Sequence, residues 1–117
     1  MSKIVLVVDD SSIARRTAKE VLEGEGYRVE EARNGQQGVD MCKLKQYSLV
    51  LSDYNMPGLN GVDMVRQIRP LPGYEHTPIF MVTTEFTRDL LTRGKNAGVT
   101  LWVVKPFDET KLRTAVR

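Results

Sequence analysis

The chain alternates between short apolar runs and longer amphipathic stretches along its whole length, and this alternation restricts its possible folds. The apolar runs are Ile4–Val8, Ser48–Leu51, Pro78–Val82 and Thr100–Val104, each about as long as one strand. Nearly continuous apolar runs of this length are typical of strands buried on both faces of a parallel sheet. The segment Tyr27–Glu31 alternates apolar and polar residues, which predicts a fifth strand nearer an edge.

Five amphipathic stretches lie between or after these runs and predict helices. Their expected starts are Ser11 or Ser12, about Gly35, Asn60, Thr87 and Asp108, and Gly24 and Gly98 are expected to end the first and fourth helices. The residues expected to face the core are Ile13, Thr17, Ala18, Val21 and Leu22 in the first helix, Met64, Val65 and Ile68 in the third, Leu90, Leu91 and Ala97 in the fourth, and Leu112, Ala115 and Val116 in the fifth. Strands alternating with helices predict right-handed βαβ units and a doubly wound α/β fold with five parallel strands and five helices.

Size and composition indicate one soluble domain over residues 1–117. Apolar residues make up 41% and charged residues 27% of the chain, and the net charge of +2 is spread along it, which does not favour nucleic-acid binding. The single cysteine, Cys42, is expected to be buried and forms no intramolecular disulfide, which fits a reducing compartment. The apolar run near the start is too short for a signal peptide core or a membrane span, so we expect a cytoplasmic location.

Charged and polar residues follow four of the apolar runs. Asp9 and Asp10 follow the first, Asp53 follows the run Ser48–Leu51, Thr83 and Thr84 follow the next, and Lys105 follows the last. Because ligands of open α/β sheets bind at the carboxyl ends of the strands, we expect these side chains to meet at one edge.

Three carboxylates in one site repel one another by about 4 kcal/mol for a pair 4 Å apart near a protein surface. A hard cation with oxygen ligands relieves this repulsion, and Mg²⁺ also leaves room for a phosphate oxygen. Zinc is disfavoured because the sequence offers no paired histidine or cysteine ligands. Lys105 and the Thr83 hydroxyl are suited to hold phosphoryl oxygens, and Asp53 is the expected nucleophile, forming an aspartyl phosphate.

These residues lie in four segments that resemble the receiver domains of two-component response regulators, particularly the single-domain chemotaxis (CheY-like) type. The segments are Val7-Val8-Asp9-Asp10-Ser11, the run from Ser52 to Gly61, Val82-Thr83-Thr84-Glu85 and Val104-Lys105-Pro106-Phe107. The resemblance covers essentially the whole chain. It implies a flavodoxin-like strand order of 2-1-3-4-5.

The resemblance also implies roles for individual residues. Asp53 would be the phospho-acceptor, and Asp10, Asp53 and the backbone carbonyl of Asn55 would bind Mg²⁺ directly, with Asp9 acting mainly through water. Lys105 and Thr83 would contact the phosphoryl group, and the Lys105–Pro106 bond is expected to be cis. Asn55, Thr84 and Glu85 occupy positions that tune the rates of phosphotransfer and hydrolysis. Thr84 stands where the family usually has a very small residue, so it is expected to narrow the path to Asp53.

The expected function is a signalling switch and not a conventional enzyme. A histidine kinase or phosphotransfer protein would phosphorylate Asp53, and a partner protein would read the change at the face formed by the fourth helix, fifth strand and fifth helix. Thr83 and Trp102, which replaces the more usual tyrosine or phenylalanine, would couple the site to that face. The alternative is a receiver excised from a longer response regulator or hybrid kinase.

Two other functions agree less well with the sequence. A phosphohydrolase of the haloacid-dehalogenase type needs a second aspartate two residues after the nucleophile, where this chain has Asn55, and usually a cap domain. A flavin-binding module needs a phosphate-binding loop after the first strand, where Asp9 and Asp10 would repel the flavin phosphate. His76 lies in a loop rich in proline and glycine and is expected to be exposed, without a catalytic role.

Overall fold

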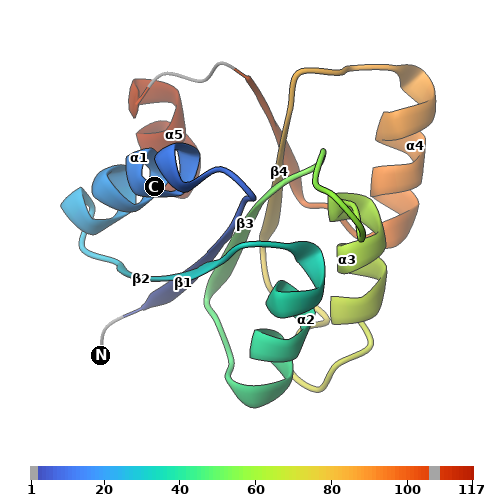
Figure 1. Ribbon diagram of the computed structural model, residues 1–117, viewed down its shortest axis with the longest axis horizontal. Helices are drawn as coiled ribbons and strands as arrows, with labels where there is room; N and C mark the ends of the chain where they lie inside the picture. Colours follow the sequence, from blue (N-terminus) through green and yellow to red (C-terminus); the bar gives the residue numbers. More distant parts are fainter. Residues whose placement is uncertain (1–2, 106–108) are drawn as a thin grey trace.

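Five parallel strands form the centre of the computed structural model, which describes residues 3–105 and 109–117 (Figure 1). The strands are β1 (Ile4–Val8), β2 (Arg28–Ala32), β3 (Leu49–Asp53), β4 (Ile79–Thr83) and β5 (Leu101–Val104). The helices are α1 (Ser12–Gly24), α2 (Gly35–Leu44), α3 (Gly61–Ile68), α4 (Arg88–Ala97) and α5 (Glu109–Val116). The strand order is β2-β1-β3-β4-β5, so the predicted flavodoxin-like α/β fold is confirmed.

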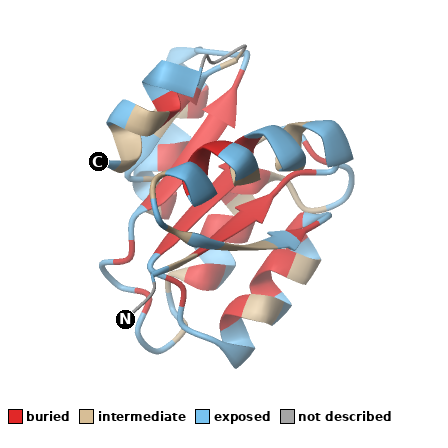
Figure 2. Ribbon diagram, turned by 90° about the vertical axis from the view of Figure 1, so that its left-hand side faces the viewer, coloured by how far each residue is buried: buried red, intermediate tan, exposed pale blue. Residues whose placement is uncertain are grey.

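Alternate residues of the strands face two separate apolar clusters, one on each side of the sheet. In β1, Val5 and Val7 pack with residues of α1 and α5, whereas Leu6 and Val8 pack with residues of α2, α3 and α4. Figure 1 shows the same division, with α1 and α5 on one side of the sheet and the other three helices on the opposite side. In Figure 2 the buried residues accordingly gather in the strands and on the inner surfaces of the helices.

Side-chain caps fix the starts of four helices close to the predicted positions. Ser11, Asn34, Asn60 and Thr87 each accept a hydrogen bond from the backbone N–H three residues later, which satisfies a donor that the helix itself leaves free. At the other end of α4, Gly98 has a φ of 108°, a left-handed conformation that glycine adopts without steric cost. The predicted cap at Asp108 lies outside the described residues.

The predicted inner face of α1 is wrong for two residues. Ile13 is 78% exposed and Thr17 is also exposed, whereas Ala18, Val21 and Leu22 are buried. With 3.6 residues per turn, Ile13 lies about 140° and Thr17 about 100° around the helix from Ala18, so neither can share its face.

The two edge strands differ from the three central ones in burial. The prediction that Thr100–Val104 is buried on both faces is wrong, because Leu101 and Val104 are 39% and 51% exposed in a strand that lies at the edge of the sheet beside β4. The expected edge position of β2 is confirmed.

Cys42 is buried and His76 is exposed, as expected. Among the described residues, no helix has the length and apolar character needed to cross a membrane.

Candidate functional site

The strand register brings the predicted residues to one edge of the sheet. Val8, the last residue of β1, pairs with Ser52, so Asp9 and Asp53 follow neighbouring positions on adjacent strands. Asp53 in turn pairs with Val82, and Thr83 pairs with Val104, the residue before Lys105. Four separate segments of the chain therefore supply side chains to the same place.

Three carboxylates and one ammonium group form the centre of this site. Asp9, Asp10 and Asp53 each offer a carboxylate oxygen, and these oxygens lie within 4.8 Å of one another. The Lys105 Nζ atom lies 3.1 Å from Asp53 Oδ1 and 3.8 Å from Asp9 Oδ2. Asp9 and Asp53 are 7% and 6% exposed, whereas Asp10 is exposed. The site thus combines two buried acids with one that faces solvent.

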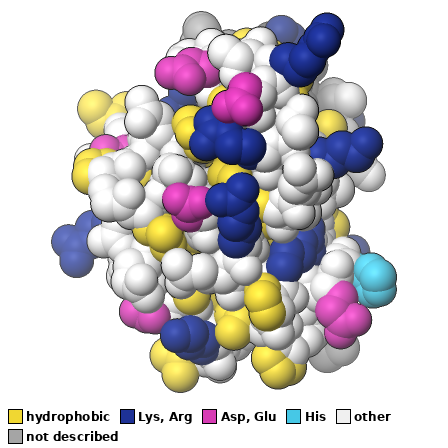
Figure 3. Space-filling model, turned by 90° about the vertical axis from the view of Figure 1, so that its right-hand side faces the viewer, with side chains coloured by type: hydrophobic (Ala, Val, Ile, Leu, Met, Phe, Trp, Pro, Cys, Tyr) yellow, Lys and Arg dark blue, Asp and Glu magenta, His cyan; other side chains and the backbone are white. Residues whose placement is uncertain are grey.

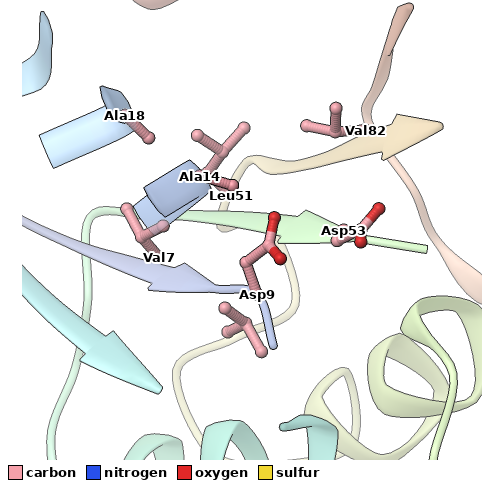
Figure 4. Close-up of a pocket in the computed structure, with 8 residues that line it drawn as sticks. Val7, Asp9, Ala14, Ala18, Leu51, Asp53 and Val82 are labelled. Carbon is pink, nitrogen blue, oxygen red and sulfur yellow. The ribbon is translucent and has the colours of Figure 1, made fainter. Parts of the chain in front are cut away.

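Apolar side chains lie directly beneath the two buried carboxylates. Asp9 and Asp53 border a cavity of about 20 Å³ that is otherwise lined by apolar residues (Figure 4), namely Val7, Val8, Ala14, Ala18, Leu51 and Val82. This burial is the main reason why the pKa of Asp9 is raised, and repulsion from Asp53 adds to it. The hydrogen bond from the Ser11 N–H to Asp9 Oδ1, 2.9 Å long, and the charge of Lys105 act in the opposite direction.

The raised pKa of Asp9 predicts that an Asp9→Asn variant is more stable than the parent protein at pH 7 in magnesium-free buffer. The folded state binds the Asp9 proton more tightly than the unfolded state, so stability is lost as pH rises from the ordinary pKa of 3.8 through the raised value. At neutral pH the free energy of unfolding of the parent protein is therefore lower than at acidic pH by this contribution. The variant has no ionisable group at position 9 and does not lose it. Urea unfolding at pH 7 and pH 3 in the presence of a chelator measures the difference, which should shrink at the lower pH. A variant less stable than the parent at pH 7 would contradict this prediction.

The remaining predicted residues follow the ends of β3 and β4 and differ in burial. Thr83 is buried, and its hydroxyl oxygen accepts a hydrogen bond from the Glu85 N–H at 2.9 Å, which leaves the hydroxyl hydrogen to be donated. Asn55, Thr84 and Glu85 are exposed. Pro106 lies outside the described residues, so the expected cis bond is not described.

Trp102 is half-buried on β5 and packs against α4. Its ring meets Phe86 edge-on, with the ring centroids 6.4 Å apart. On the other side it lies against Gly94 in the middle of α4, where a Cβ atom would overlap the indole. The ring therefore fits this helix only because residue 94 is glycine.

Sequence reasoning did not identify Arg15, whose side chain contacts the main chain of Asp9. Its Nη1 atom donates a 2.7 Å hydrogen bond to the backbone carbonyl of Asp9. A backbone carbonyl is present at every residue, so the sequence contains no sign of this partner. The one available signal is the opposite charge of Glu31 at the end of the predicted second strand.

Comparison with known proteins identifies the family. Residues 5–117 match the family model of the response regulator receiver domain. Chemotaxis protein CheY-3 of Vibrio cholerae is 36% identical over 110 residues, which cover 93% of this chain and 85% of that protein. The solved structure of chemotaxis protein CheY4 of Vibrio cholerae has a TM-score of 0.95 at 34% identity and covers 99% of this chain and 97% of that one.

A further relative was solved with a metal ion. The receiver domain of the sensor histidine kinase PA1611 from Pseudomonas aeruginosa has a magnesium ion coordinated in its active-site cleft. It has a TM-score of 0.89 at 25% identity and covers 99% of this chain and 95% of that one. The fold, the carboxylate cluster and these matches lead to one conclusion: the chain belongs to the response regulator receiver domain family and resembles single-domain chemotaxis proteins of the CheY type over nearly its whole length.

Proposed function

We propose that this protein is a phosphorylation switch that accepts a phosphoryl group on Asp53 from a histidine kinase or a phosphotransfer protein. The observation that supports this most strongly is the environment of the Asp53 carboxylate, which is buried at a strand end, lies 3.1 Å from Lys105 and has two other carboxylates beside it. An ionised carboxylate oxygen is a competent nucleophile toward phosphorus, and the ammonium group of Lys105 is placed to compensate part of the negative charge of the incoming phosphoryl group.

The donor set of this site suits magnesium. When all three carboxylates are ionised, Lys105 is the one cationic side chain among the described residues that forms an ion pair with any of them, contacting Asp9 and Asp53, so net negative charge remains. A hard divalent cation with a preference for oxygen ligands compensates this charge. Asp10, Asp53 and the Asn55 carbonyl would hold the ion, with Asp9 acting mainly through water. The relative with magnesium coordinated in its active-site cleft supports a magnesium ion at this site. When bound, the ion would neutralise the acids and polarise a phosphoryl oxygen.

Lys105 and Thr83 would bind the transferred group. The ammonium group of Lys105 already contacts Asp53, so a phosphoryl oxygen attached to Asp53 comes within its reach. The free hydroxyl hydrogen of Thr83 can be donated to a second oxygen. Asn55, Thr84 and Glu85, all exposed near the strand ends, would tune how fast the acyl phosphate forms and hydrolyses.

The output surface would be the face formed by α4, β5 and α5. Phe86, Leu101 and Val104 are exposed large apolar residues at this face, and Arg88 and Arg93 lie on α4 beside them. Figure 3, viewed from the side of α3 and α4, shows basic side chains among apolar ones. Thr83 and Trp102 would transmit the state of Asp53 to this face, where a partner protein binds. The same chemistry would serve a receiver within a longer response regulator or hybrid kinase, and either role places the chain in the cytoplasm.

Phosphoryl uptake from a small donor tests the proposal directly. The purified protein should incorporate one phosphoryl group per chain from acetyl phosphate in the presence of magnesium, and a chelator should reduce uptake to background. Intact-protein mass spectrometry measures the stoichiometry. The label should be lost in hydroxylamine, which cleaves acyl phosphates but not phosphate esters. A label that resists hydroxylamine, or that forms equally well without magnesium, would contradict the proposed chemistry.

A further inference from the structure

Arg15 joins the loop that bears the acidic residues to the edge of the sheet. The side chain is only 12% exposed, although it lies on the first turns of α1 at the protein surface. Its Nη1 atom donates to the backbone carbonyl of Asp9 at 2.7 Å, and its Nε atom donates to Glu31 Oε1 at 3.0 Å. Glu31 belongs to β2, so one guanidinium group connects α1, the β1–α1 loop and the edge strand.

Asp10 and Asp9 differ in the contacts that hold them. Asp10 is exposed, and within the described part of the chain no hydrogen bond or ion pair reaches its carboxylate. The neighbouring Asp9, by contrast, is held by three hydrogen bonds in addition to its ion pair with Lys105. Its N–H donates to the Ala32 carbonyl at 3.1 Å, its side chain accepts from the Ser11 N–H, and its carbonyl accepts from Arg15.

The carbonyl of Asp9 belongs to the peptide group that leads into Asp10. The orientation of a planar peptide group fixes the direction in which the next residue starts. A rotation of this group would carry the Asp10 carboxylate away from Asp9 and Asp53, while leaving the buried carboxylates in place. Within residues 3–105 and 109–117, Asp10 is the one member of the cluster whose carboxylate takes part in no hydrogen bond or ion pair, so the orientation of this peptide group matters most for Asp10.

We propose that Arg15 is a positioning residue for the cation site, and that it acts by holding the Asp9–Asp10 peptide group so that Asp10 faces the other two carboxylates. Glu31 holds the guanidinium group in place and compensates its charge. This inference rests on the proposed function, because it takes magnesium as the ligand of the carboxylates. Partners that orient metal ligands without touching the metal commonly affect metal affinity by about 10–100-fold.

The charge of Arg15 allows this role to be distinguished from a purely electrostatic one. A positive charge near the carboxylates opposes the binding of a cation, so removing it would strengthen magnesium binding if charge were its only contribution. Loss of a positioning contact has the opposite effect. The direction of the change in magnesium affinity thus separates the two roles.

The experiment compares magnesium binding by the parent protein and by Arg15→Met, Arg15→Lys and Arg16→Met, using isothermal titration calorimetry. We expect the Kd for magnesium to rise about tenfold in Arg15→Met. It should also rise in Arg15→Lys, which keeps the charge but cannot reach two partners with one ammonium group. Arg16 is exposed on the same helix and supplies the matched control, because its removal deletes an equal charge without loosening the loop. The Kd of Arg16→Met for magnesium should equal that of the parent protein or be slightly lower.

The folded state of each variant is checked by circular dichroism and urea unfolding before titration, because a structural role alone would lower stability and leave the Kd of the folded protein unchanged. A Kd in Arg15→Met equal to or lower than that of the parent would overturn the inference. If Arg15→Met does not fold, the Kd of Arg15→Lys for magnesium provides the test, and a value equal to that of the parent would likewise overturn the inference. Failure of the parent protein to bind magnesium would refute the proposed function instead, a result distinct from all of these.

Discussion

An Asp53→Asn variant is expected to take up no phosphoryl group from acetyl phosphate, with magnesium present at a concentration that saturates the parent protein. The amide is nearly the same size as the carboxylate but has no ionised oxygen to attack phosphorus. The substitution also removes one of the three negative charges of the carboxylate cluster, and it is the charge nearest to Lys105. Incorporation should therefore fall to background, measured by intact-protein mass spectrometry after incubation with the donor.

Asp40→Asn is a suitable control for this variant. Asp40 is exposed on α2, and its replacement removes the same charge from a different part of the surface. Uptake by this control should equal that of the parent. Urea unfolding of the Asp53 variant verifies that it is folded. Undiminished labelling of a folded Asp53→Asn protein would exclude Asp53 as the acceptor, whereas equal losses in both variants would indicate a general effect of charge.

Arg69 stabilises the side of the molecule opposite to α1 through contacts with backbone carbonyls. It lies at the end of α3, where its Nη1 atom donates to the carbonyls of Tyr74 and Thr77, each at 2.7 Å. Its Nε atom donates to the carbonyl of Gly98 at 3.1 Å. One guanidinium group thus links the loop before β4 with the end of α4. Burial lowers the pKa of Arg69, but a guanidinium group starts from so high a value that it stays charged at neutral pH.

Replacement of Arg69 with alanine is expected to lower the free energy of unfolding by about 3 kcal/mol. Hydrogen bonds from a charged donor contribute roughly 1.5–3 kcal/mol each, and three carbonyls lose such a donor together, so their contributions do not add fully. Arg69→Lys should recover only part of the loss, because a single ammonium group cannot span partners on both segments. Urea unfolding followed by circular dichroism measures both changes, and an unchanged m-value would show that they reflect stability.

Arg66 provides the comparison on the same helix. Its side chain is 49% exposed and pairs with Asp63 at 2.7 Å, three residues earlier. Exposed pairs of this kind contribute less than about 1 kcal/mol, so Arg66→Ala should have a small effect. If Arg66→Ala and Arg69→Ala lowered the free energy of unfolding by the same amount, the carbonyl contacts of Arg69 would not be the source of its contribution to stability.

The sequence predicted those features that depend on residue type and spacing. The pattern of apolar and charged side chains indicates the burial of the three central strands and the residues that follow each strand. The order of elements and the meeting of Asp9, Asp53 and Lys105 at one edge could therefore be inferred. The prediction was less accurate where neighbours decide the outcome. Ile13 is apolar but exposed, because the face of α1 that turns inward is set by the sheet beneath Ala18 and Leu22.

Arg15 and Arg69 show a second limit of sequence reasoning. Both are long basic side chains on helices, a pattern that usually indicates a solvated surface. Their partners are carbonyl groups of the main chain, which come together only once the fold has formed. Charge patterns in a sequence indicate possible ion pairs between side chains, but they contain no information on which main-chain groups lie within reach.

The glycine at position 94 makes the position of a helix and the orientation of a ring depend on each other. Glycine inside a helix lowers the stability of the helix by about 1 kcal/mol relative to alanine. At position 94 the missing side chain leaves space beside the backbone, and the indole of Trp102 fills this space. If the ring turned outward, it would leave a hollow against the backbone of α4, and close-packed interiors do not keep such hollows open without cost. The helix α4 would then have to move toward the sheet to fill the space that the Trp102 ring had occupied. Because the chain contains no other tryptophan, its fluorescence should report the position of α4 as directly as it reports the ring.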